Sequence, residues 1–357
     1  MTESPRSVLV TGGAGFVGSA LVRRLVGGEG ARVTNLDALT YAGTRESVAE
    51  VAGSAAYRFV HADVCDAVVV RRAIADCQPQ WIVHLAAESH VDRSIDEPAP
   101  FVRTNVLGTA TMLDEALRFW RTLDAGAADA FRFVHVSTDE VYGSLGPTGR
   151  FTEGSPYRPT SPYAATKAGA DHLARTWLLT YGLPVVISSC TNNYGPFQFP
   201  EKFIPTVIRC ALAGEPIPVY GAGDQVRDWL YVDDHVEALL AVARRGVPGE
   251  TYNIGGGNER RNLDVVRSVC AVIDEMAPSA QGPSARLIAH VADRPGHDRR
   301  YAVDAGKAAA SLGWRPRESF ASGIRRTVSW YLRNREWTAR LLDGAYRGER
   351  LGLGARP

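Results

Sequence analysis

Short runs of apolar residues alternate with longer amphipathic stretches through the first half of the chain. The apolar runs span residues 7–11, 32–36, 57–60, 81–86 and 131–137, which are lengths typical of buried strands. Strands that alternate with helical stretches indicate a parallel sheet whose right-handed crossovers cover both faces. We therefore predict a doubly wound α/β fold, in which ligands bind beyond the carboxyl ends of the strands.

The second half of the chain has a different pattern. From Tyr194 onward, Pro, Gly and charged residues accumulate, as in GEPIPVYGAGDQVRDW (214–229) and ADRPGHDRRY (292–301). Such composition predicts a smaller lobe, rich in loops and partly helical, laid over the binding edge of the sheet. We expect weak structure only near 125–130 and from Gly344 onward.

The charge balance and the cysteines limit the choice of partners. The 357 residues include 40 Lys plus Arg and 39 Asp plus Glu, a formal net charge of +1, so neither nucleic acid nor an anionic membrane is an expected partner. Five scattered cysteines without a Cys-x-x-Cys pair fit a reducing cytosol. Because no apolar run approaches the about 20 residues of a membrane span, and no leader pattern is present, we expect a cytoplasmic protein.

A glycine-rich turn follows the first apolar run. The string TGGAGFVG (11–18) places glycines at 12, 15 and 18, ahead of an amphipathic helix that we expect over 19–26. Such glycines allow a tight strand-to-helix turn and close approach of backbone N–H groups to a pyrophosphate. Asp37 ends the second run, where a carboxylate accepts hydrogen bonds from an adenosine ribose and repels the extra phosphate of NADP. The pattern therefore predicts NAD.

Two further pairs of residues point to proton transfer. Tyr163 and Lys167 are four apart in a helix expected after Pro162, so they share one face, and a nearby ammonium would lower the pKa of the phenol toward working pH. Asp139 and Glu140 adjoin at the end of the fifth run, where two acids are poor for stability but suit a dehydration that needs both an acid and a base. By themselves, a surface Tyr-Lys pair and a helix-capping Asp are the plainer interpretations.

Together these motifs resemble the extended short-chain dehydrogenase/reductase superfamily and, within it, the dTDP-glucose 4,6-dehydratases. The resemblance covers about residues 5–337. Its most specific strings are HLAAESHVDRSI (84–95), STDEVYG (137–143), SPYAATKAGADH (161–172), NNYGPFQFPEKFIP (192–205), YGAGDQVRDWLYVDDH (220–235), TYNIGGGNERRNLDVV (251–266) and ADRPGHDRRYAVD (292–304). Related epimerases and decarboxylases share the first-half pattern but generally lack the Asp-Glu pair.

The resemblance implies a reaction sequence. Tyr163 would deprotonate the sugar 4-hydroxyl while a hydride passes from C4 to NAD, with Thr138 bonded to the developing carbonyl oxygen. Glu140 would then remove the C5 proton, and Asp139 would protonate the C6 hydroxyl so that water leaves. Return of the hydride to C6 and of a proton to C5 would give a 4-keto-6-deoxy sugar and regenerate NAD.

The resemblance also implies binding residues. Cofactor contacts would come from Gly12, Gly15, Phe16, Val17, Gly18, Asp37, Thr40, Asp63, Val64, Leu85, Ala86, Ala87, Thr104, Tyr163, Lys167 and Asn193. The nucleotide-sugar substrate would contact Ser89, Thr138, Asn192, Lys202, Phe203, Pro218, Tyr220, Arg227, Asn262, Arg294, His297 and Tyr301. Two guanidiniums suit a diphosphate because their planar forks pair its oxygens bidentately, and the histidine spacing indicates no metal.

On this basis we expect an NAD-binding Rossmann domain over 1–191, with returning segments at about 226–254 and 301–316. The substrate lobe would comprise 192–225 and 255–357, and the protein would be a homodimer. Three alternatives stay open: a nucleotide-sugar 4-epimerase or decarboxylase on the same scaffold, a 4,6-dehydratase of another nucleotide-linked hexose, and a non-catalytic NAD-sensing protein.

Overall fold

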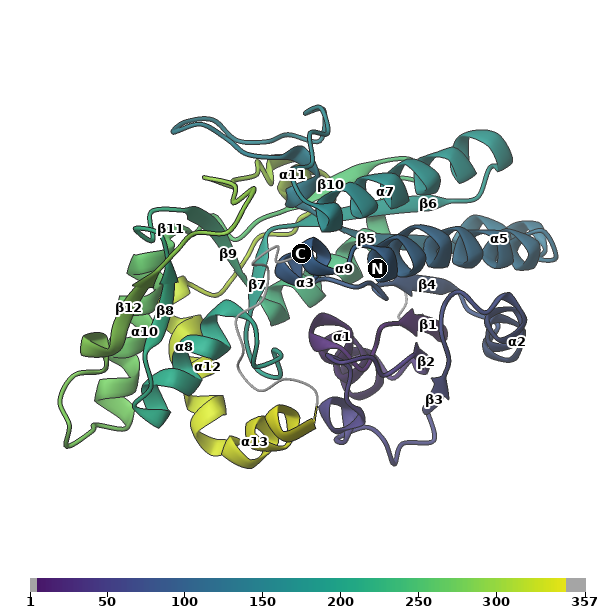
Figure 1. The fold of residues 1–357 in the computed structure, drawn as a ribbon. Coiled ribbons are helices and arrows are strands. Elements are labelled where there is room, and N and C mark those ends of the chain that lie inside the picture. The colour runs from purple at the N-terminus through teal and green to yellow at the C-terminus, as the bar shows by residue number, and fades with distance from the viewer. Residues whose placement is uncertain (1–4, 345–357) are drawn as a thin grey trace.

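A seven-stranded parallel sheet forms the centre of the computed structural model, which describes residues 5–344 (Figure 1). Its strands are β1 (Ser7–Thr11), β2 (Arg32–Asp37), β3 (Tyr57–His61), β4 (Trp81–His84), β5 (Arg132–Thr138), β6 (Val185–Cys190) and β10 (Thr251–Ile254). They are ordered β10-β6-β5-β4-β1-β2-β3, and all neighbours are parallel. The predicted doubly wound α/β fold is confirmed, although β4 ends two residues earlier than the apolar run.

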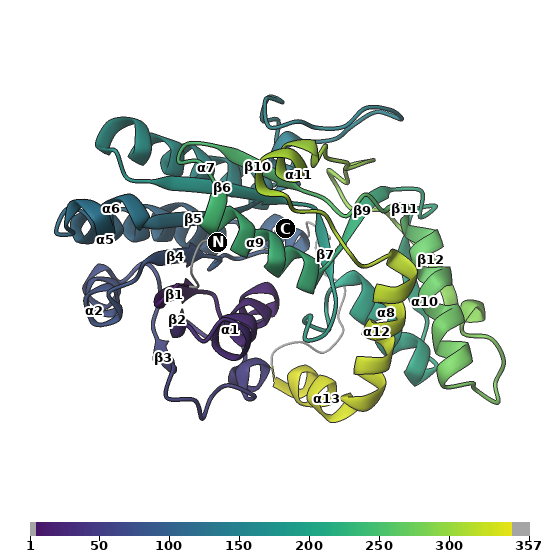
Figure 2. The same ribbon diagram turned by 180° about the vertical axis from the view of Figure 1, so that it is seen from behind.

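Helices cover both faces of this sheet because its strands are apolar on both sides. On one face, α1 (Phe16–Gly28) and α9 (Val232–Arg245) lie side by side and pack against Val8 and Val10 (Figure 2). On the other face, α2 (Ala67–Cys77), α5 (Thr109–Trp120) and α7 (Pro162–Tyr181) cover Leu9 and Ile82. The sheet core is therefore closed to water, and polar groups gather beyond the strand ends.

The order of the strands creates a binding crevice. The chain passes from β1 outward through β2 and β3, then returns to β4 on the other side of β1. Loops that leave β1 and β4 therefore diverge, and an open crevice at their carboxyl ends is the usual ligand site of such a sheet. Short elements border it: η1 (Arg45–Val48), α3 (Val91–Asp96), α4 (Ala99–Phe101), the π-helical η2 (Val102–Gly108) and η3 (Asp139–Tyr142).

The second half forms a lobe beside this crevice, with more regular structure than the loop-rich pattern predicted (Figures 1 and 2). It holds a three-stranded sheet of β11 (Glu259–Arg261), β9 (Val226–Tyr231) and β7 (Asn192–Tyr194), and a two-stranded sheet of β12 (Ile288–Val291) and β8 (Ile217–Tyr220). Its helices are α8 (Phe203–Ala213), α10 (Asn262–Met276), η4 (Ser284–Leu287), α12 (Phe320–Arg333) and α13 (Arg335–Gly344). A core that includes Tyr194, Trp229 and Tyr231 holds it together.

Two segments expected to be weakly structured have different outcomes. Residues 125–130 form a short helix, α6 (Ala125–Ala130), whose first turn is capped by the Asp124 carboxylate accepting from the Ala127 N–H at 2.8 Å. That prediction was wrong because an aspartate N-cap and four alanines favour a helix. The other segment, beyond Gly344, lies outside the described residues. In the part of the chain that the structure describes, no helix is both long and apolar enough to span a bilayer.

A buried acid connects the sheet to the lobe. The Asp234 carboxylate, on α9, accepts hydrogen bonds from the backbone N–H groups of Arg317 and Glu318 at 3.0 and 2.8 Å. These N–H groups belong to the segment between α11 (Gly306–Leu312) and α12. Neighbouring Asp233 is exposed at the surface and therefore offers a matched comparison.

We predict that Asp234→Ala lowers the free energy of unfolding by about 1–3 kcal/mol, because it leaves buried backbone donors without an acceptor. Asp233→Ala should change it by less than about 0.5 kcal/mol. Urea unfolding followed by circular dichroism measures both variants. Equal losses in the two variants would contradict this role of Asp234.

Candidate active site

Two joined cavities open at the carboxyl ends of the central strands. The first, of about 360 Å³, lies over the β1–β4 crevice, and the second, of about 580 Å³, extends under the lobe. Residues shared by both linings are Ser89, Glu140, Asn192, Asn193, Gln198 and Lys202. A long ligand with two chemically different halves therefore fits this space better than a compact one.

All sixteen residues predicted for the cofactor line the first cavity. The glycine turn has a steric reason: Gly12 has a φ of +71°, and a Cβ there would lie 2.7 Å from the Ala86 backbone nitrogen. A Cβ on Gly18 would lie 2.1 Å from the Gly12 carbonyl oxygen. Larger residues at these positions would push α1 away from β1 and fill the crevice that a pyrophosphate needs.

Asp37 lines the first cavity and not the second. Its two oxygens accept hydrogen bonds from the backbone N–H groups of Ala14 and Leu39, both at 2.8 Å. Each carboxylate oxygen retains a lone pair for a ribose hydroxyl. Burial raises the pKa of Asp37 above its ordinary value. Within the described residues, the lining of this cavity contains no arginine, so the site fits NAD and offers no partner for the extra phosphate of NADP.

The predicted catalytic residues meet where β5 ends and α7 begins. Thr138 is the last residue of β5, and its hydroxyl accepts from the Glu140 backbone N–H at 3.3 Å, which starts η3. Helix α7 begins at Pro162 because the Ser161 hydroxyl accepts from the Ala164 N–H at 3.1 Å. The hydroxyl of Ser94 accepts from the Tyr163 N–H at 3.2 Å, which ties α3 to this helix start.

The environment of Tyr163 differs from the expectation. We expected the ammonium of Lys167 to lower the pKa of the phenol, but burial raises the pKa of Tyr163 well above its ordinary value and the Glu140 charge raises it further. The Lys167 ammonium donates to the Val136 carbonyl oxygen at 2.7 Å. The prediction was therefore wrong for the chain by itself, and ionisation of Tyr163 needs positive charge near the phenol.

Asp139 and Glu140 have different electrostatic surroundings although they are adjacent. Burial raises the pKa of Asp139 well above its ordinary value, and the charges of Glu140 and Asp228 raise it further. Burial also raises the pKa of Glu140, but the guanidiniums of Arg294 and Arg227 act in the opposite direction. The pair therefore suits a division of work in which Asp139 gives a proton and Glu140 takes one.

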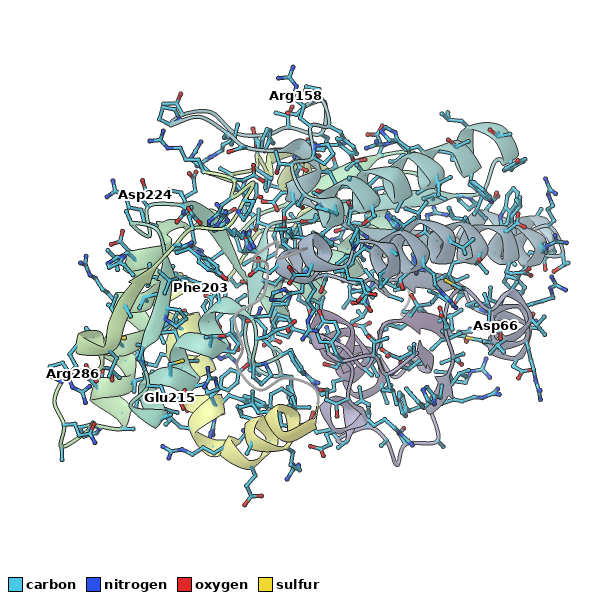
Figure 3. The ribbon with its side chains drawn as sticks, viewed as in Figure 1. Asp66, Arg158, Phe203, Glu215, Asp224 and Arg286 are labelled. Atoms are coloured by element: carbon cyan, nitrogen blue, oxygen red, sulfur yellow. The ribbon has the colours of Figure 1, made fainter. Side chains whose placement is uncertain are left out.

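Residues predicted to bind the substrate line the second cavity, except for Thr138, which lines the first. Arg227 is almost fully buried and stacks over the Tyr301 ring at 4.2 Å, while its NH2 group donates to the Asp298 carbonyl oxygen at 2.8 Å. Arg294 forms an ion pair with Asp92. Phe203, labelled in Figure 3, begins α8 where the lobe faces the sheet.

Comparisons with known proteins agree with this geometry. The model of the GDP-mannose 4,6 dehydratase family matches residues 9–327. A dTDP-glucose 4,6-dehydratase of Escherichia coli is 53% identical over 97% of this chain and 99% of the relative. One of Neisseria meningitidis is 54% identical over 98% of this chain and 99% of its own. The chain belongs to the dTDP-glucose 4,6-dehydratase family.

Solved structures agree with this assignment. A dTDP-glucose 4,6-dehydratase of Streptomyces venezuelae, solved with NAD and TYD bound, is 46% identical, with a TM-score of 0.85 over 94% of this chain and 99% of that one. A UDP-glucose 4-epimerase of Thermotoga maritima has a TM-score of 0.80 at 28% identity, over 91% of this chain and 98% of that one. The scaffold is thus shared with epimerases, whereas the higher identity belongs to the dehydratases.

Some residues of this dehydratase site were missed by sequence reasoning. Glu201 and His90 line the second cavity, and the guanidinium of Arg93 donates to the Glu201 carboxylate at 2.9 Å. Tyr220 donates to Asp92 at 3.0 Å. Tyr220 was predicted, whereas the missed residues His90, Asp92, Arg93 and Glu201 lie within the strings SHVDRSI (89–95) and FPEKFIP (199–205), where the only available signal was charge next to aromatic residues. Among the described residues, no cluster of His, Cys, Asp and Glu could hold a metal ion.

A stability measurement tests the electrostatics of Asp139. Folding raises the pKa of Asp139. At any pH above its unfolded pKa of about 3.9, Asp139 therefore lowers the free energy of unfolding. We predict that Asp139→Asn raises the melting temperature near pH 7 by a few degrees, that the gain vanishes near about pH 4, and that turnover falls at least about a hundredfold.

Differential scanning calorimetry at both pH values checks this prediction. The control is Asp224→Asn, which changes an exposed acid of the lobe and should leave the melting temperature unchanged at either pH. A stabilisation by Asp139→Asn that was the same at both pH values would contradict the account.

Proposed function

We propose that the chain dehydrates dTDP-glucose to dTDP-4-keto-6-deoxyglucose, with NAD as a resident cofactor. The observation that carries the proposal is the placement of Asp139, Glu140 and Tyr163 around one cavity that runs on into a guanidinium-lined pocket. Relatives that carry out this dehydration by name are more than half identical over nearly the full chain.

The cofactor would be held by residues of the first cavity. The turn around Gly12 would receive the pyrophosphate, Asp37 the adenosine ribose and Lys167 the nicotinamide ribose. When bound, NAD would supply a hydride acceptor for C4 of the sugar and, in its reduced form, a hydride donor for C6.

The side chains of the chain supply the proton transfers. Tyr163 takes the proton of the sugar 4-hydroxyl, and the Thr138 hydroxyl donates to the carbonyl oxygen that forms. The ketone acidifies the neighbouring C5–H bond, from which Glu140 removes the proton. Asp139, whose burial favours the protonated form, gives its proton to the C6 hydroxyl so that it leaves as water. Glu140 finally returns a proton to C5.

The lobe would position the nucleotide. Arg227 and Arg294 would neutralise the diphosphate, and the remaining predicted substrate residues would hold the base and sugars.

We also propose a division into two domains: a Rossmann domain over 1–191 with returning segments at about 226–254 and 301–316, and a lobe from 192–225 and 255–357. The five cysteines are all free thiols, which supports a cytoplasmic location.

The alternatives are less well supported. A 4-epimerase shares the scaffold but has no use for an acid and a base beside C5 and C6, and the UDP-glucose 4-epimerases of Thermotoga maritima and Thermus thermophilus are only 28% and 32% identical to this chain. A 4,6-dehydratase that acts on another nucleotide-linked hexose is the better supported alternative, because the matching family model is named for GDP-mannose 4,6 dehydratase. A non-catalytic NAD-sensing protein would have no need of Tyr163, Lys167 and both acids together.

We propose a homodimer that pairs through the α5–α7 side. Val102 and Leu107 on η2 expose 53% and 55% of their surface, and Leu179 near the end of α7 exposes 84%. A second copy of the chain would cover these apolar side chains, which belong to η2 and α7, two elements that pack against each other.

The first prediction of this function is direct. The purified protein, supplied with dTDP-glucose, should form a dTDP-4-keto-6-deoxyhexose without net consumption of NAD. Mass spectrometry of the product should show the loss of one water. Formation of dTDP-galactose would instead support the epimerase. Conversion of GDP-mannose without conversion of dTDP-glucose would assign GDP-mannose as the substrate.

A second prediction separates the oxidation from the loss of water. Glu140→Gln keeps the shape of the side chain but cannot take the C5 proton, so water loss should fall by at least about a hundredfold. The ketone should still form, and reduced cofactor should accumulate in its near-ultraviolet absorbance after substrate is added. Tyr163→Phe is the matched control, because it should prevent that accumulation. Normal turnover in Glu140→Gln would remove Glu140 from its role.

A further inference from the structure

Helix α7 carries an acid that the reaction does not use. Asp171 lies one helical turn after Lys167, has no exposed surface and lines neither cavity. A fully buried carboxylate is costly unless it is neutralised or hydrogen-bonded. Its position therefore needs a reason, and Lys167 and Arg175 are the charged residues one helical turn away on the same helix face.

Asp171 is held as a carboxylate by donors from several elements. The Ser137 hydroxyl, on β5, donates to Oδ2 at 2.8 Å, and the Tyr157 hydroxyl donates to the same oxygen at 2.7 Å. Nε2 of His135 lies 3.1 Å from Oδ1. Burial by itself would raise the pKa of Asp171, but His135, the charge of Lys167 and the Tyr157 hydroxyl bring it below its ordinary value.

Lys167 has few groups that stabilise its charge. It is 5% exposed, and its ammonium donates to the Val136 carbonyl oxygen at 2.7 Å. Burial lowers the pKa of Lys167, and Asp171 is the first of the groups that raise it again. Val136 contacts the ammonium, and Ser137, the next residue of β5, contacts the carboxylate, which brings the two groups close enough for their charges to interact.

The other titratable groups around this pair do not supply a negative charge at working pH. Burial lowers the pKa of His84, on β4, and of His135, on β5, so both rings are neutral. Burial raises the pKa of the Cys190 thiol, on β6, to about 12, and raises those of Tyr142 and Tyr157. Arg175, one turn further along α7, adds positive charge and donates to the Tyr157 hydroxyl at 2.7 Å.

We propose that Asp171 is a positioning residue of the dehydration, which keeps Lys167 an ammonium inside the protein and thereby allows Tyr163 to ionise. The inference deepens the proposed function and rests on it for the role of Tyr163. It acts in two steps. Asp171 balances the charge of Lys167, and the ammonium, one helical turn from Tyr163, then supplies part of the positive charge that a phenolate needs against burial and the negative charge of Glu140.

The composition of the chain makes the first step measurable. Only three lysines occur, at 167, 202 and 307. Selective labelling of lysine with ¹³C at Cε therefore gives three side-chain signals, and Lys307→Arg and Lys167→Arg assign them. The chemical shift of the Cε carbon reports the protonation of each ammonium as the pH is raised, without substrate or turnover.

In the parent protein, Lys167 should be charged at neutral pH. In Asp171→Asn, the midpoint of its titration should fall by about one pH unit or more, a tenfold loss of proton affinity. Asp171→Glu, which keeps the charge, should restore the parent midpoint. Tyr157→Phe removes a neutral donor from the same carboxylate and should shift the midpoint by less than about half a unit.

Kinetics tests the second step. In Asp171→Asn, kcat at neutral pH should fall by about tenfold or more, and the acid limb of its pH profile should move upward by about one unit, while KM changes less than about twofold. Asp171→Glu should recover both kcat and the profile. The matched control is Asp234→Asn, a buried acid that lines neither cavity, which should lower stability without moving the acid limb.

The results that overturn the proposal are distinct from those that overturn the proposed function. An unchanged titration midpoint of Lys167 in Asp171→Asn overturns the inference. A neutral Lys167 in the parent protein at neutral pH also overturns it, and this second measurement does not require the variant to fold. An unchanged acid limb overturns the second step. A parent protein that does not convert dTDP-glucose but shows the predicted lysine titration overturns the function and supports the charge balance.

Discussion

The active site depends on keeping ionisable groups out of water while balancing their charges. Asp139, Tyr163 and Lys167 are each almost fully buried, and burial opposes the charged form of each. The surrounding residues decide which of them ionise. Near Glu140, the guanidiniums of Arg294 and Arg227 favour a carboxylate, whereas Asp139 has more negative charge around it. One cavity can therefore hold a proton donor and a proton acceptor at adjacent positions.

The fold supplies this arrangement through its strand ends. A parallel sheet brings the ends of β1, β4 and β5 to one edge, so residues distant in sequence surround a single crevice. The lobe then places positive charge over that edge without exposing the acids to solvent. A chain whose formal net charge is only +1 meets an anionic substrate by local placement of arginines.

The sequence predicted the parts of this structure that depend on local patterns. Apolar runs located five strands, because strands buried on both faces are apolar throughout, and the glycines at 12 and 18 marked a turn that side chains cannot enter. Contacts between distant segments were not predictable in the same way. The environment of Tyr163 depends on Glu140, and the role of Asp171 depends on Tyr157 and His135, which come from other elements. The sheets of the lobe were missed because their strands are only three to six residues long.

The fate of hydrogen at C5 tests the central claim most directly, because that atom is removed and replaced only if an acid and a base act beside the sugar. The measurement is mass and NMR analysis of the product made from dTDP-glucose in D₂O. The account predicts one deuterium at C5 with the parent protein and no such product with Glu140→Gln. A 4-keto-6-deoxy product that carries the original hydrogen at C5 would contradict it.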